Sequence, residues 1–264
     1  MRIVIRSLIL ALLVSQSDAK AGVMYGFDEA TNQLISIDSS SGTSSVIGSL
    51  GLGNVAEIAG FGNALFGAKY DSDELISIDR STGAATVVGK FGAFSNVIGL
   101  TFDNTGTLYG IDDGTDSVIT IDTLTGTATA VASLTNTNVS GIAFASDGTL
   151  FASDHAAGNL LSINTTTGAI TTVGAINVPG VQFRSIAFRS DGTLFAADTL
   201  GNNLYTLNTT TAAATLVGDM GFSAVTGITF ASPVVPEPAS GCVWVVGCLL
   251  VLSRTRRVAH RTKV

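Results

Sequence analysis

Carboxylates that recur at a regular spacing are the residues of this sequence with the clearest capacity to bind a ligand. Asp28, Asp112, Asp154 and Asp198 each end a short apolar run, and Lys69 holds the same place in one further copy. Such carboxylates, gathered at one site, could bind Ca²⁺ through their oxygen atoms. Because Asp side chains commonly bond the backbone of a following turn, and this Asp recurs from copy to copy, we favour turn capping.

Two neighbouring acidic segments form a more specific candidate for a cation site. Its ligands would be Asp71, Asp73, Asp112, Asp113 and Asp116. Neither segment has the spacing of an EF-hand loop, so solvated negative charge is the favoured interpretation and a calcium site is the alternative. We expect no other cofactor.

Breaks in the repeat pattern mark a candidate site for a polar ligand. Where other copies have glycine, this chain has Glu57 and Ser185, and Arg184 precedes the latter. Glu57, Lys69 and Arg184 would then surround one opening and hold a polar ligand. The alternative is that these charges pair with one another.

Residues for nucleophilic catalysis are scarce. His155 is the only histidine between residues 22 and 232, and no G-x-S-x-G motif occurs. A Ser-His-Asp arrangement would have to use Asp154, and a neighbour in the chain is poorly placed to orient the imidazole ring. The sequence therefore favours a protein that is not an enzyme.

Five similar segments carry these residues and set their spacing. They begin about 42 residues apart and span residues 24–48, 65–89, 108–132, 150–174 and 194–218. Each contains short runs rich in Val, Ile, Thr and aromatic residues, which is typical of strands. A repeat of this length built from strands indicates the blades of a β-propeller.

Turn residues punctuate each repeat at fixed places. Asp147-Gly148 stands between the first two runs, and Asp-x-x-Thr-Gly, as at 79–83 and 122–126, stands between the last two. Such residues supply side-chain hydrogen bonds and left-handed backbone. In the last repeat, Ala212 replaces the glycine that ends the second of these turns, so that turn should be strained or built differently.

The ends of the repeat array predict how the ring closes. The chain enters at a second strand near Met24 and leaves on a first strand, residues 227–231, which should pair beside residues 24–28. We therefore predict an all-β, five-bladed β-propeller over residues 22–232, closed by its C-terminal strand. A signal helix and a hydrophobic helix would flank it. Gly141–Asp154 also resembles NHL-type propeller repeats, which implies a fold and no activity.

Both ends of the chain carry targeting features. Residues 1–21 have two arginines, an apolar run and a small-x-small site, as a secretory signal peptide does. Residues 233–264 contain Pro236, Glu237 and Pro238, an apolar stretch and a basic cluster. This segment resembles the PEP-CTERM sorting signal of Gram-negative bacteria. The resemblance implies transient membrane contact, processing by an exosortase, a place on the cell envelope or in the matrix, and a link to exopolysaccharide and biofilm. An ordinary membrane anchor is the alternative.

The distribution of charged residues limits the kinds of partner that we expect. The chain has a formal net charge of −7, and most of its basic residues lie in the two terminal segments. An acidic exported domain repels phosphate backbones, so we expect no nucleic acid partner. We expect a non-enzymatic surface or matrix protein that binds a glycan or an envelope protein. The alternative is a calcium-dependent propeller hydrolase or lyase acting on a sugar or lactone.

Overall fold

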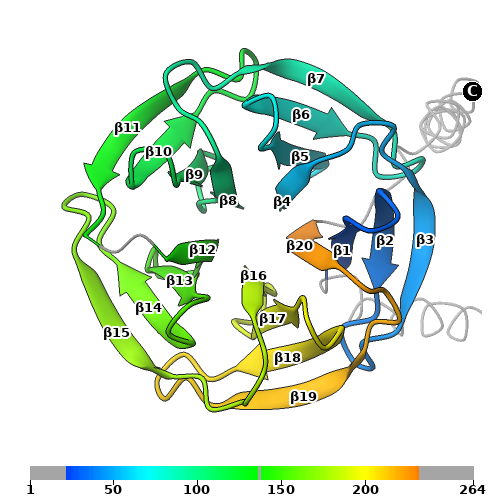
Figure 1. Ribbon diagram of the computed structural model, residues 1–264, viewed down its shortest axis with the longest axis vertical. Coiled ribbons are helices and arrows are strands. Elements are labelled where there is room, and N and C mark those ends of the chain that lie inside the picture. The colour runs from blue at the N-terminus through cyan, green and yellow to red at the C-terminus, as the bar shows by residue number, and fades with distance from the viewer. Residues whose placement is uncertain (1–21, 136–137, 232–264) are drawn as a thin grey trace, which may run out of the picture. The chain divides into compact units, whose positions relative to one another are not determined.

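The described part of the chain, residues 22–135 and 138–231, consists of β-strands joined by turns and loops. The computed structural model arranges these strands in five four-stranded antiparallel sheets around one axis, as Figure 1 shows. The predicted all-β, five-bladed propeller is therefore confirmed.

The blades are numbered in chain order, and their strands are given from the axis outward. Blade 1 contains β20 (Val225–Ala231), β1 (Val23–Asp28), β2 (Gln33–Ile37) and β3 (Ser44–Ser49). Blade 2 contains β4 (Val55–Phe61), β5 (Ala64–Lys69), β6 (Glu74–Ile78) and β7 (Ala85–Lys90). Blade 3 contains β8 (Val97–Phe102), β9 (Leu108–Asp112), β10 (Ser117–Ile121) and β11 (Ala128–Ser133). Blade 4 contains β12 (Val139–Phe144), β13 (Leu150–Asp154), β14 (Asn159–Ile163) and β15 (Ile170–Ala175). Blade 5 contains β16 (Phe183–Phe188), β17 (Leu194–Asp198), β18 (Asn203–Leu207) and β19 (Ala214–Asp219).

Blade 1 joins the two ends of the described chain. β20 pairs antiparallel with β1, with Met24 opposite Phe230 and Gly26 opposite Ile228. The predicted closure of the ring by its last strand is confirmed. Backbone hydrogen bonds within one sheet, and not only side-chain packing between sheets, therefore hold the ring shut.

The turns between third and fourth strands have the predicted construction. In blade 2, Gly83 N donates to Asp79 O at 2.7 Å, and the Asp79 side chain accepts from Ser81 N at 2.8 Å. Ala212 makes the same backbone bond, to Asn208 O at 2.8 Å, with a φ of 60°. That turn is thus strained but not built differently, because alanine occupies the left-handed conformation that favours glycine.

Adjacent blades touch through their backbones at the outer rim. The left-handed turn residue of each blade, which is glycine in every blade except blade 5, faces a small residue near the end of the outer strand of the blade before it. The pairs are Gly48 with Gly83, Gly89 with Gly126, Ala132 with Gly168, Gly174 with Ala212, and Gly218 with Gly42. Each pair keeps at least one glycine, and alanine never meets alanine. The strained Ala212 therefore faces a glycine, which leaves room for its methyl group.

Every outer strand carries a β-bulge. In blade 1, Leu34 pairs with Gly48 and Ile35 with Val46, so Ile47 has no partner. The same register shift occurs in the other blades, at Val88, Val131, Val173 and Val217. The extra residue bends the outer strand and increases its twist.

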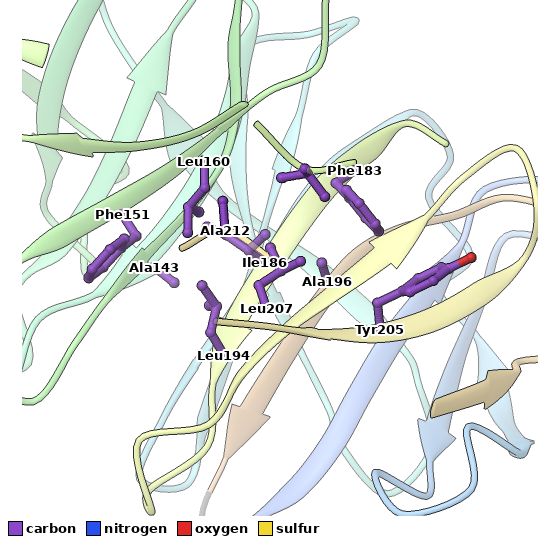
Figure 2. Close-up of a cluster of buried hydrophobic side chains, with 11 residues drawn as sticks. Ala143, Phe151, Leu160, Phe183, Ile186, Leu194, Ala196, Tyr205, Leu207 and Ala212 are labelled. Atoms are coloured by element: carbon purple, nitrogen blue, oxygen red, sulfur yellow. The ribbon is translucent and has the colours of Figure 1, made fainter. Parts of the chain in front are cut away.

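The hydrophobic core lies between blades. Figure 2 shows one cluster, in which Phe151 and Leu160 of blade 4 lie close to Leu194 and Leu207 of blade 5. In blade 5, Phe183 stacks edge-on to Tyr205 at 5.3 Å. Each second strand contributes one aromatic residue to the core, with Tyr25, Phe151 and Phe195 buried and Phe66 and Tyr109 partly buried. Each interface between blades is thus filled by apolar side chains from both.

The predicted terminal helices and the sorting residues Pro236, Glu237 and Pro238 lie outside the described residues. Residues 22–135 and 138–231 contain no helix long and apolar enough to cross a membrane.

We expect Gly48→Ala to lower the free energy of unfolding by about 2 kcal/mol, the usual cost of overpacking. A Cβ at this position would overlap the carbonyl oxygen of Thr82 in the next blade. Urea denaturation measures the change. Gly53→Ala is the matched control, because no atom lies within 4 Å of the added methyl group. We expect the control to shift stability by less than about 1 kcal/mol, and equal losses in both variants would contradict the rim contact.

Candidate functional site

A pocket of about 410 Å³ opens on the propeller axis, at the end where the innermost strands begin. All five blades contribute to it. Its lining consists of Glu29, Ala56, Tyr70, Asn96, Ile98, Asp113, Ser140, His155, Arg184 and Thr226. The volume lies within the range usual for sites that bind small molecules.

Bulges in the innermost strands place half of the lining. In blade 2, Val55 pairs with Lys69 and Glu57 with Ala68, so Ala56 has no partner between them. The equivalent unpaired residues in the other blades are Ile98, Ser140, Arg184 and Thr226. A bulge redirects a side chain out of the regular alternation of a strand. Here all five bulged residues line the pocket.

A second ring of lining residues follows the second strands. Glu29, Tyr70, Asp113 and His155 each come directly after the residue that ends β1, β5, β9 or β13. Inner strands β4, β8 and β12 pair with β5, β9 and β13. In each pair, the first residue of the inner strand lies opposite the last residue of the second strand. The two rings therefore lie at the same end of the blades.

The recurrent aspartates hold loops in place. Asp112 is buried, and its Oδ2 accepts Thr115 N at 2.9 Å while its Oδ1 accepts Ser95 N at 2.8 Å. Asp28 makes equivalent bonds, to Thr31 N and Ala224 N. Each carboxylate therefore ties its own turn to the loop that enters the same blade. This geometry agrees with turn capping, the interpretation that the sequence favours.

In blade 2, Lys69 stands in the place of the recurrent aspartate, and it donates a hydrogen bond to the entering loop where the aspartates accept one. Its Nζ donates to Gly53 O at 3.0 Å and forms an ion pair with Asp71 at 2.7 Å. The hydrogen bond from Lys69, followed by the one from Asn54, lowers the pKa of Asp71. Lys69 thus holds the loop over residues 50–54, and it does not line the pocket.

Glu57 lies beneath the pocket and is 1% exposed. Its Oε1 accepts Ser185 Oγ at 2.9 Å and Ile58 N at 3.1 Å, whereas its Oε2 has no partner. The equivalent residues of the other blades are small, namely Gly99, Gly141, Ser185 and Gly227. Burial raises the pKa of Glu57 well above its usual range. Glu57 occupies the level of the axis between the large pocket and a cavity of about 80 Å³ at the other end, where the other blades have glycine or serine.

Of the three residues predicted to surround one opening, only Arg184 lines the pocket. Its side chain is exposed and makes no ion pair with any residue in the described ranges. Nearby, Tyr70 Oη donates to Glu29 Oε1 at 2.8 Å. This bond is the main cause of the raised pKa of Tyr70. His155 Nδ1 is buried and has no hydrogen-bond partner.

Four of the five acids of the predicted calcium site accept hydrogen bonds from other residues of the protein. Asp71 accepts Lys69 and Asn54, Asp73 accepts Asn96 N, and Asp113 accepts the Asn96 side chain at 2.8 Å. Asp112 caps its turn, as above, and Asp116 has a left-handed φ of 50° at the end of its loop. Among the described residues no three His, Cys, Asp or Glu side chains come together to hold a metal ion.

The sequence did not single out Glu29, Tyr70, Asn96, Ser140 or Thr226. One signal could have found Glu29 and Tyr70, because the residue after the recurrent Asp varies from repeat to repeat whereas the Asp is nearly constant. The bulged position leaves no such mark, since it falls inside a run of ordinary strand residues.

We expect the free energy of unfolding of the Glu57→Gln variant to fall less steeply with rising pH than that of the wild type. Between the ordinary pKa of 4.5 and its raised folded value, the folded protein holds an extra proton, so its stability falls by up to about 1.4 kcal/mol per pH unit. Gln cannot ionise. The variant should match the wild type near pH 4 and exceed it near pH 7, by urea denaturation. Parallel pH profiles would show that Glu57 folds in its charged form.

We expect EDTA to leave the Tm unchanged, because no three His, Cys, Asp or Glu side chains of the described residues come together to hold a metal ion. Differential scanning calorimetry with and without the chelator measures this. A Tm that falls with EDTA and recovers with added Ca²⁺ would instead support the calcium-dependent alternative.

Comparison with solved structures found distant similarities. Virginiamycin B lyase from Staphylococcus aureus is 16% identical, with a TM-score of 0.48, over 76% of this chain and 70% of that chain. A crystal structure of a nidogen/laminin complex is 16% identical, with a TM-score of 0.53, over 78% of this chain and 84% of that chain. A likeness at this identity concerns the fold alone. The curated proteins contain no match.

The family described as "Repeat of unknown function (DUF6923)" matches residues 62–224, more than half of the chain. The chain therefore belongs to the DUF6923 repeat family.

Proposed function

We propose that this protein is an exported, non-enzymatic binding protein of the cell surface or extracellular matrix of a Gram-negative bacterium, and that it binds a glycan in the axial pocket. The observation that carries the proposal is the pocket itself, about 410 Å³ in volume and lined by polar side chains from all five blades. An envelope protein that inserts a side chain into the same pocket is the competing ligand.

The lining suits a ligand rich in hydroxyl groups. Glu29 and Asp113 offer carboxylate oxygens, Arg184 offers guanidinium N–H groups, and Tyr70 offers an aromatic ring with a polar tip. These groups can accept and donate many hydrogen bonds around a sugar ring. Because the lining comes from five sheets that are packed on one another, the site is largely formed before the ligand arrives.

Export and processing complete the proposal. Residues 1–21 would be removed as a signal peptide, residues 22–232 would form the propeller, and residues 233–264 would contact the membrane until an exosortase-type enzyme cuts near Pro236, Glu237 and Pro238. The end of β20 at Ala231 supports cleavage at this place, because a cut beyond residue 235 leaves the strand that closes the ring whole.

We expect Ala56→Phe to weaken glycan binding at least tenfold, because the ring would fill the pocket from its bulge. A glycan array and titration calorimetry on the full chain measure the effect. Ala64→Phe is the matched control, since this exposed residue begins β5 at the opposite end of the same blade. Equal glycan binding by both variants would show that the glycan does not bind in the axial pocket.

We expect the protein recovered from the cell surface or medium to begin near Gly22 and to lack its last 25 or so residues. Intact mass and N-terminal sequencing measure both ends. A chain that remains in the cytoplasm, or that keeps its C-terminal segment, would contradict the sorting part of the proposal.

A further inference from the structure

The ionisable side chains of the axial pocket are unevenly distributed among the blades. Arg184 comes from blade 5, and His155 comes from the neighbouring blade 4. The two carboxylates, Glu29 and Asp113, follow strands of blades 1 and 3. The pocket thus has a basic part and two acidic parts, and a ligand must match that arrangement.

Arg184 is a cation that the fold does not use. The ion pairs of the described residues join Lys69 to Asp71 and Arg189 to Asp191, at 2.7 and 2.6 Å. Arg184 forms no such pair, although two acids line the same pocket. Its backbone lies in the β16 bulge, which turns the side chain toward the axis. The guanidinium therefore keeps its hydrogen-bond donors available for a ligand.

His155 lines the same part of the pocket. Its Nδ1 is enclosed by the protein and has no hydrogen-bond partner among the described residues, so a ligand in the pocket does not reach this atom. Arg184 therefore supplies the hydrogen-bond donors of this part of the pocket.

The acids limit how much negative charge the ligand can carry. Glu29 already accepts Tyr70 Oη, and Asp113 already accepts the Asn96 amide, both at 2.8 Å. Their remaining oxygen lone pairs favour hydroxyl donors and repel a second anionic group. A phosphate-rich or otherwise highly charged ligand is thereby disfavoured. A single carboxylate matches the planar fork of one arginine.

We infer that the pocket binds a sugar with one carboxylate, of the uronic acid type. Its carboxylate contacts Arg184, and its hydroxyls face Glu29 and Asp113. This inference rests on the proposed glycan binding and adds the class of sugar.

Titration calorimetry on the full chain with glucuronate, glucose and acetate tests it. Glucose has the same ring without the carboxylate, and acetate has the carboxylate without the ring. We expect glucuronate to bind at least tenfold more tightly than either. Raising the salt concentration should weaken glucuronate binding and leave glucose binding unchanged.

Arg184→Gln should weaken glucuronate binding about tenfold and leave the weaker glucose binding unchanged. Lys90→Gln is the matched control, because it removes the same charge from an exposed residue at the end of outer strand β7. The Tm of each variant reports its folding. We expect the control to bind all three ligands as the wild type does.

Three results would overturn the inference. If glucose binds as tightly as glucuronate, the pocket binds glycans but does not select a carboxylate, and the proposed function stands. If both variants lose glucuronate binding equally, net charge and not Arg184 is responsible. If no sugar in the calorimeter or on the array binds, the inference and the proposed glycan binding fall together.

Discussion

Close approach of backbone to backbone is the constraint on which this propeller depends. Five sheets can surround one axis only if neighbouring blades nearly touch, and they do so at two radii. At the rim, each pair of facing residues keeps at least one glycine, as in Gly48 with Gly83. At the axis, the third residue of each inner strand is small in every blade except one. Glu57 is that exception, and its side chain fills the space that the others leave.

The same crowding explains why the pocket lies where it does. At the level of their third residues the inner strands hold one large side chain, Glu57, and it is buried, so ligand-binding groups must come from the level above it. A bulge at the second residue of each inner strand supplies them without disturbing the strand pairing below. The bulge is common to all blades, but the residue in it ranges from Ala56 to Arg184. A constant backbone feature thus presents a variable side chain, as expected of a scaffold that carries a site.

The repeat made most of the fold predictable. Strand content, turn construction and ring closure all follow from local residue types and from the order of the strands at Met24 and at residues 227–231. The site was harder to predict from the sequence, because a bulge depends on the pairing of two strands and not on the residue within it. Arg184 was identified through a break in the pattern. Glu57 was identified by the same break, yet it lies below the pocket, since a shift of one residue moves a side chain to another level.

The bulged outer strands bear on how this protein behaves when it is crowded. Each blade exposes one sheet edge at the rim, and β3, β11 and β15 carry no charged residue that would deter another strand from adding to them. Straight edges of this composition are templates for intermolecular sheets and fibrils. The unpaired residue in each edge, Ile47 in blade 1, interrupts the regular row of donors and acceptors. Irregular edges therefore protect this neutral rim from aggregation, a role that charged side chains have in many other sheets.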